Sequence, residues 1–84
     1  MHYSYRTNGV CAHKVEFDVE DGVIENIEFV GGCEGNHKGV AALAAGMTPD
    51  EAMRRLKGIT CGRRTTSCPD QLANALEEFL QKQR

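Results

Sequence analysis

Four cysteines are the residues of this 84-residue chain best suited to chemistry. Each lies beside a glycine, in an expected turn or at an expected helix start, and none interrupts an apolar periodic run, where a packing cysteine would be expected. Thiolates in such positions ligate metals or exchange disulfides. They are Cys11, Cys33, Cys61 and Cys68. Their placement predicts a thiol-based function.

Cys68 is the strongest single candidate for a reactive thiol. Ser67 is an expected helix N-cap, which would place Cys68 in the first helical turn, where backbone amides and the helix dipole stabilise a thiolate. Arg63 and Arg64 lie a few residues upstream and would add positive potential. Cys68 and Cys61 are the candidate redox thiols, and we expect Cys68 to be the most reactive thiol. A quietly buried cysteine is the alternative interpretation.

A shared metal site is the second possibility for the same thiols. No Cys-x-x-Cys pair occurs, so a tetrahedral zinc site would have to be assembled from distant loops. The candidate ligands of zinc or an iron–sulfur cluster are Cys11, Cys33, Cys61 and Cys68. We expect the last three to converge at one end of a sheet, with the first nearby. His13 and His37 could add nitrogen ligands, although a surface or capping role is the simpler interpretation of each.

A glycine-rich turn offers a site of a different kind. Glycines allow close backbone approach and can direct amide groups at an anion. The candidate cofactor-binding residues are Gly31, Gly32, Gly35 and Asn36, with Arg63 and Arg64. A nucleotide, flavin or pterin is the expected ligand class. A tight strand-to-helix turn explains the same glycines equally well.

Composition excludes several classes of protein. The chain has 10 basic and 12 acidic residues, a net charge of -2, which argues against a general nucleic-acid binder. It contains no run of 18 apolar residues, and its first residues show no signal-peptide pattern, so we expect a cytoplasmic protein without membrane spans. In that compartment thiols are better explained by metal or redox work than by structural disulfides. No hydrolase arrangement of residues stands out.

The strands are predicted from alternating hydrophobicity. Residues 13–20 and 23–30 alternate, and residues 3–6 could form an edge strand. A three-residue Glu20–Gly22 loop would pair Val19 with Val23 and keep the odd-numbered apolar side chains on one face. We therefore predict an antiparallel sheet of three strands.

Three helices are predicted to follow in the second half of the chain. The first opens at Gly35 or Asn36 and ends at Gly46, with an apolar stripe of Val40, Leu43, Ala44 and Met47. The second has Thr48 as its N-cap and Glu51 completing a capping box, and the third opens at Ser67. The predicted fold is a single α+β domain over residues 1–84, with three helices covering one face of the sheet in two layers.

The sequence resembles the TSCPD domain family. Residues 66–70 read Thr-Ser-Cys-Pro-Asp, and residues 29–33, 46–51 and 57–62 are also similar to the short, stand-alone members of that family. The family also occurs as a C-terminal segment of cobalamin-dependent ribonucleotide reductases. The resemblance therefore implies an association with ribonucleotide reduction and DNA synthesis.

A more distant similarity is to the U-type iron–sulfur cluster scaffold proteins. The order of matching features is Cys11, Gly32-Cys33, the stretch 46–52 and Cys68. The chain departs from the scaffold pattern in reading Cys-Ala-His at 11–13 and in having Cys61 as an additional thiol. The similarity to the scaffold proteins implies binding of an iron–sulfur cluster. It is a less direct indication than the TSCPD resemblance, which implies an association with ribonucleotide reductase.

The leading hypothesis is a small cysteine-based redox or metal-binding module associated with ribonucleotide reductase. The alternatives are a non-catalytic domain that binds a small anionic ligand at the glycine-rich turn, and a zinc or iron–sulfur carrier. A chain of this size cannot build the substrate barrel and radical generator of a reductase, so stand-alone reductase activity is not expected. We also expect a homodimer, because the margins of a three-stranded sheet carry unpaired backbone.

Overall fold

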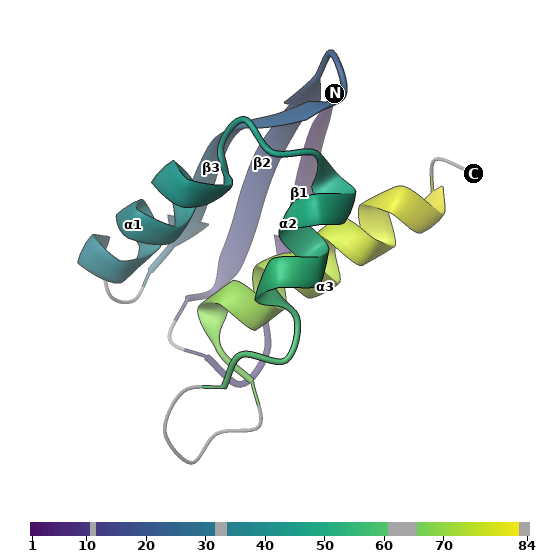
Figure 1. Ribbon diagram of the computed structural model, residues 1–84. Helices are drawn as coiled ribbons and strands as arrows, with labels where there is room; N and C mark the ends of the chain where they lie inside the picture. The colour runs from purple at the N-terminus through teal and green to yellow at the C-terminus, as the bar shows by residue number, and fades with distance from the viewer. Residues whose placement is uncertain (11, 32–33, 61–65, 83–84) are drawn as a thin grey trace.

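The computed structural model describes residues 1–10, 12–31, 34–60 and 66–82, and it has the α+β architecture predicted from the sequence (Figure 1). Its three strands form one antiparallel sheet in the order β1-β2-β3. The elements are β1 (His2–Arg6), β2 (Lys14–Glu20), β3 (Val23–Val30), α1 (Glu34–Ala44), α2 (Pro49–Leu56) and α3 (Cys68–Lys82). None of the helices in the described part of the chain has the length and apolar content needed to cross a membrane.

The hairpin between β2 and β3 differs from the sequence prediction. Its loop is the two-residue Asp21-Gly22 turn, so Glu20 pairs with Val23 and Val19 pairs with Ile24. Both turn residues have positive φ, 53° and 80°, as a two-residue hairpin turn of the mirror-image type requires. The predicted three-residue loop, which paired Val19 with Val23, is therefore wrong.

A β-bulge on β3 explains why the shorter loop still gives an apolar face. The register passes from Asp18 opposite Glu25 to Glu16 opposite Glu28, so two residues of β3 face Phe17 alone. Asn26 in this bulge has a φ of 51°. The extra residue moves the buried face from the even position of Ile24 to the odd positions that follow it. The prediction assumed that the apolar side chains of β3 occupy odd-numbered positions along the whole strand. It therefore missed the bulge.

The hydrophobic core lies between the sheet and the helices. Figure 1 shows α2 and α3 crossing one face of the sheet, while α1 lies along β3. The largest fully buried side chains are Phe17, Ile24, Leu72, Leu76 and Val15. The rings of Tyr3, Phe17 and Phe79 contact one another with centroids 5.6 to 5.8 Å apart, which joins β1, β2 and α3.

The predicted apolar stripe of α1 is correct in part. Ala44 is buried and Val40 packs against the core, but the side chain of Leu43 is 76% exposed. Leu43 lies on the side of α1 that faces α2, where it borders a small groove together with Met47 and Leu56. The sheet is narrow, so α1 can turn only part of its apolar surface toward the core.

Candidate functional site

The first turn of α3 is fixed by the local sequence. The Ser67 Oγ accepts a hydrogen bond from the Asp70 amide at 3.2 Å, and the Ser67 carbonyl accepts one from the Gln71 amide at 2.8 Å. Ser67 is therefore the N-cap, as predicted, because its hydroxyl satisfies an amide that has no partner within the helix. This cap places Cys68 at the first position of the helix.

Asp70 anchors this helix start to the segment that follows α2. Its Oδ1 accepts a hydrogen bond from the Gly58 amide at 2.7 Å, and its Oδ2 accepts one from the Thr66 hydroxyl at 2.5 Å. The Ser67 hydroxyl also donates to the Ile59 carbonyl at 2.6 Å. Ser67 and Asp70 are buried, and their partly buried hydrogen bonds hold the two segments together.

Gln71 connects the same helix start to the loop after β1. Its Oε1 accepts a hydrogen bond from the Asn8 amide at 3.0 Å, and its Nε2 donates to the Thr66 hydroxyl oxygen at 3.0 Å. The methyl group of Thr66 lies close to Gly9, where a Cβ would be only 3.3 Å from it. The loop after β1 and the segment after α2 therefore both contact the beginning of α3.

Cys68 and His37 form a buried thiol–imidazole pair at this point. The distance from the His37 Nε2 to the Cys68 Sγ is 3.1 Å, and the two residues are 6% and 9% exposed. The His37 ring stacks on Phe29 of β3, with centroids 4.5 Å apart and planes at 25°. Burial lowers the pKa of His37, so the imidazole is held neutral at neutral pH, with a nitrogen lone pair that can ligate a metal or accept a proton.

Gly31, at the end of β3, has a structural role. Its φ is +86°, and a Cβ at this position would lie 2.7 Å from the Cδ2 of His13. The His13 amide also donates to the Val30 carbonyl at 2.7 Å, which holds the two segments side by side. Glycine is required here for backbone conformation and close packing. Gly31 therefore supports the interpretation of the glycine-rich segment as a tight strand-to-helix turn.

Most of the predicted site residues lie outside the described part of the chain. Of the proposed thiols, only Cys68 is described, and Gly31 is the only predicted cofactor-binding residue that can be described in full. Gly35 and Asn36 belong to the first turn of α1. The residues outside the described ranges are Cys11, Gly32, Cys33, Cys61, Arg63 and Arg64. The convergence of the thiols and the reactivity of Cys68 therefore stay predictions.

Sequence reasoning undervalued His37. A surface or capping role was the simpler interpretation, and the structure shows that it is wrong, because the ring is buried against Phe29 and Cys68. Its spacing from Val40 and Ala44, three and seven residues, places it on the buried stripe of α1 and could have indicated this. Among the residues that the structure describes, no three or more His, Cys, Asp or Glu side chains are grouped so that they could hold a metal ion.

The fold and this site define a small α+β domain whose Thr-Ser-Cys-Pro-Asp segment begins the last helix. The family model of the TSCPD domain matches residues 2–80, and the chain belongs to that family. A search of curated proteins and a search of solved structures each found no match.

Proposed function

We propose that this protein is a small cysteine-based metal-binding module and that Cys68 and His37 are two of its ligands. The observation that carries the proposal is the 3.1 Å contact between the Cys68 Sγ and the His37 Nε2 in a buried position. Thiolate sulfur and neutral imidazole nitrogen are the commonest zinc ligands, with bonds of about 2.3 Å and about 2.0 Å. A tetrahedral site separates such ligands by about 3.5 Å, so the pair would open by less than about 0.5 Å on metal binding.

The remaining ligands would come from Cys11, Cys33 and Cys61. Support comes from the described segments near Cys11 and Cys61, which reach the start of α3. The Asn8 amide bonds to Gln71, and the Ile59 carbonyl accepts from Ser67. Zinc is the first expectation and an iron–sulfur cluster the second, since both accept thiolate ligands.

Thiol redox exchange is the second candidate function. It is favoured by the position of Cys68 at the first residue of α3, where the helix dipole stabilises a thiolate, and by the adjacent imidazole. In this case Cys68 and Cys61 would form a disulfide by transferring two electrons and two protons to a disulfide acceptor. For either function, a cytoplasmic setting and an association with ribonucleotide reductase are proposed from the family resemblance.

The test is metal analysis with ultraviolet–visible spectroscopy on protein purified without oxygen. We expect a stoichiometric metal in the unmodified chain and its loss in Cys68→Ser and His37→Gln. His2→Gln is the matched control, because His2 is exposed and bonds to Glu16 and Asp18 instead. Circular dichroism establishes whether each variant is folded. A metal-free protein that cycles between thiol and disulfide would favour the redox candidate, and a bound organic chromophore would contradict both.

The homodimer also stays a prediction. The exposed Leu43, with the partly buried Val40 and Met47 beside it, is apolar surface that a second copy would cover. Light scattering after size exclusion at low micromolar concentration should give twice the 9.2 kDa mass of the chain. A mass near that of one chain would contradict the homodimer and would leave the metal proposal untouched.

A further inference from the structure

The outer edge of β3 already makes backbone hydrogen bonds with another segment of the chain. The Ile24 amide donates to the Met47 carbonyl at 2.8 Å, and the Gly46 amide donates to the Ile24 carbonyl at 2.8 Å. The short segment between α1 and α2 therefore pairs with the first part of this edge. It shows that backbone groups from outside the sheet can pair with β3 on the side away from β2.

The rest of this edge carries backbone groups that point away from the sheet. The Val30 carbonyl accepts from the His13 amide, so the peptide groups of Val30 point toward the loop before β2, and those of Glu28, two residues earlier in the strand, point to the same side. In an antiparallel ladder the residues between them direct their groups to the opposite side. Within the described ranges, no backbone hydrogen bond joins Ile27 or Phe29 to a segment beyond the sheet. Such groups are a template for an added strand.

A groove runs along this part of the edge. Its volume is about 660 Å³, with Ile27, Glu28 and Phe29 on one wall and Lys38 and Ala41 of α1 on the other. From Asn26 to Gly31 the edge is about 16 Å long at the rise of a β-strand, which accommodates an added strand of about five residues. Grooves between a strand edge and a helix bind extended peptides through main-chain hydrogen bonds, and their walls select alternate side chains.

The charges beside the groove determine which segment fits. The charged residues of β3 are Glu25 and Glu28, both exposed, and their direct cross-strand neighbours are Asp18 and Glu16. Asp18 and Glu16 already pair with His2, and Glu16 also pairs with Lys14. Within the described ranges Glu25 and Glu28 form no ion pair, so a basic residue on an added strand would supply the missing partner of Glu28. A second copy paired symmetrically about Glu28 would place the Glu28 carboxylates of the two copies opposite each other. The opposite side of an added strand would meet Phe29 and Ala41, which favour an apolar side chain, and Lys38 on the same wall disfavours a basic one there.

We propose that the groove between β3 and α1 binds an extended peptide segment of a partner protein in which basic and apolar residues alternate. The partner backbone pairs with Ile27 and Phe29, its basic side chains lie beside Glu28, and its apolar side chains lie against Phe29 and Ala41. His37, a ligand in the metal proposal, also lines this groove, but the inference does not require a bound metal, because it rests on the backbone edge and charges of β3.

The test is an NMR titration of the full chain at low ionic strength. Two end-capped hexapeptides serve as probes, one alternating Lys and Val and the other alternating Glu and Val. We expect the Lys peptide to shift the amide signals of Ile27 and Phe29 and to slow their hydrogen exchange, with binding at least tenfold tighter than that of the Glu peptide. Glu28→Lys should reverse this preference.

Two further variants separate the groove from general surface binding. Ala41→Trp fills the groove from α1 and should weaken binding of the Lys peptide at least tenfold. Ala42→Trp is the matched control on the exposed side of the same helix and should bind as the unmodified chain does. The proposal is overturned if neither peptide protects the two amides at millimolar concentration. It is also overturned if these amides are already protected in a dimer of the chain, or if only a small anion such as AMP shifts them.

Discussion

Helices α2 and α3 begin with the same chemistry but use it for different purposes. In α2 the Thr48 Oγ1 accepts a hydrogen bond from the Glu51 amide at 3.2 Å, and in α3 the Ser67 Oγ accepts one from the Asp70 amide at 3.2 Å. In each case the acidic residue three positions after the cap lies in the first turn. These features establish the helix starts and are local in sequence.

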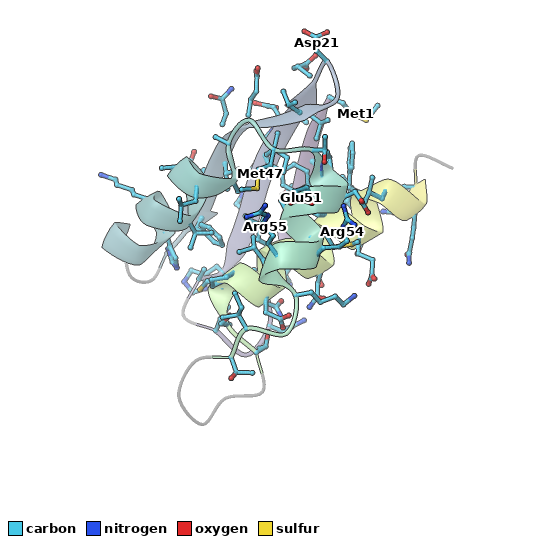
Figure 2. All side chains as sticks on the ribbon, viewed as in Figure 1. Met1, Asp21, Met47, Glu51, Arg54 and Arg55 are labelled. Carbon is cyan, nitrogen blue, oxygen red and sulfur yellow. The ribbon has the colours of Figure 1, made fainter. Side chains whose placement is uncertain are left out.

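The two acidic residues differ in what surrounds them. Figure 2 shows Glu51 with Arg54 and Arg55 on α2, and the Glu51 carboxylate pairs with these arginines of its own helix at 3.1 and 2.6 Å. Asp70 is buried and bonds to Gly58 and Thr66, outside its helix. The capping pattern therefore predicts where a helix starts, but tertiary packing determines whether that start also anchors other segments.

Replacing Asp70 should have the largest effect on stability. Asp70→Ala removes two partly buried hydrogen bonds to a carboxylate and leaves the Gly58 amide without its acceptor, so we expect a loss of about 3 kcal/mol in the free energy of unfolding. Urea denaturation measures this loss. Asp70→Asn is the matched control and should lose less, because an amide can still accept from Gly58. If Asp70→Ala is no more destabilising than Glu51→Ala, the distinction between the two helix starts is wrong.

Replacing Ser67 should have the next largest effect. Its hydroxyl caps the helix and also donates to the Ile59 carbonyl, so Ser67→Ala should cost about 2 kcal/mol. Ser67→Thr keeps the hydroxyl and serves as the control. The same urea experiment should show that Thr recovers part of the loss. Equal losses in the two variants would indicate a packing effect at this position.

Replacing Thr48 should cost less than replacing Ser67. The Thr48 hydroxyl makes the corresponding cap at an exposed position, so Thr48→Ala should cost about 1 kcal/mol, the usual value of an N-cap. Thr48→Ser should be close to the unmodified chain. A loss for Thr48→Ala as large as that for Ser67→Ala would show that the anchoring contact to Ile59 contributes nothing.

Glu51 should give the smallest effect, and that effect should depend on pH. The hydrogen bond from the Arg55 side chain lowers the pKa of Glu51 below its usual value of 4.5, and the positive charges of Arg55 and Arg54 lower it further. A lowered pKa in the folded state means that the contribution of this pair is present at neutral pH and is lost as the pH falls through that pKa. Carboxyl NMR titration should report the lowered value, and Arg55→Gln should raise it. An unchanged pKa in Arg55→Gln would contradict the ion pair.

The features predicted correctly from the sequence are those determined by residues close to one another along the chain. The caps at Thr48 and Ser67 and the alternation of β2 are local patterns, and the structure confirms them. Glu51 completes only part of the predicted capping box, because its carboxylate pairs with the arginines. The hairpin loop was predicted wrongly because the bulge at Asn26 lets a tight turn and a continuous apolar face coexist, and no local pattern specified it.

The candidate site was less predictable for the same reason. Cys68 was identified from its place at a helix start, but its contact with His37 requires α1 and α3 to be brought together by the fold. The apolar stripe of α1 could have indicated that His37 is buried, but no pattern within one helix specifies that its ring contacts Cys68. The groove between β3 and α1 also depends on how far the helix stands from the strand edge.

The most direct test of the metal-binding proposal is X-ray absorption spectroscopy of the chain loaded with zinc. The proposal predicts sulfur ligands at about 2.3 Å and a nitrogen ligand at about 2.0 Å, with imidazole scattering that disappears in His37→Gln but not in His2→Gln. It also predicts one sulfur fewer in Cys68→Ser. A coordination shell of oxygen and nitrogen alone, or a spectrum unchanged by His37→Gln and Cys68→Ser, would contradict it.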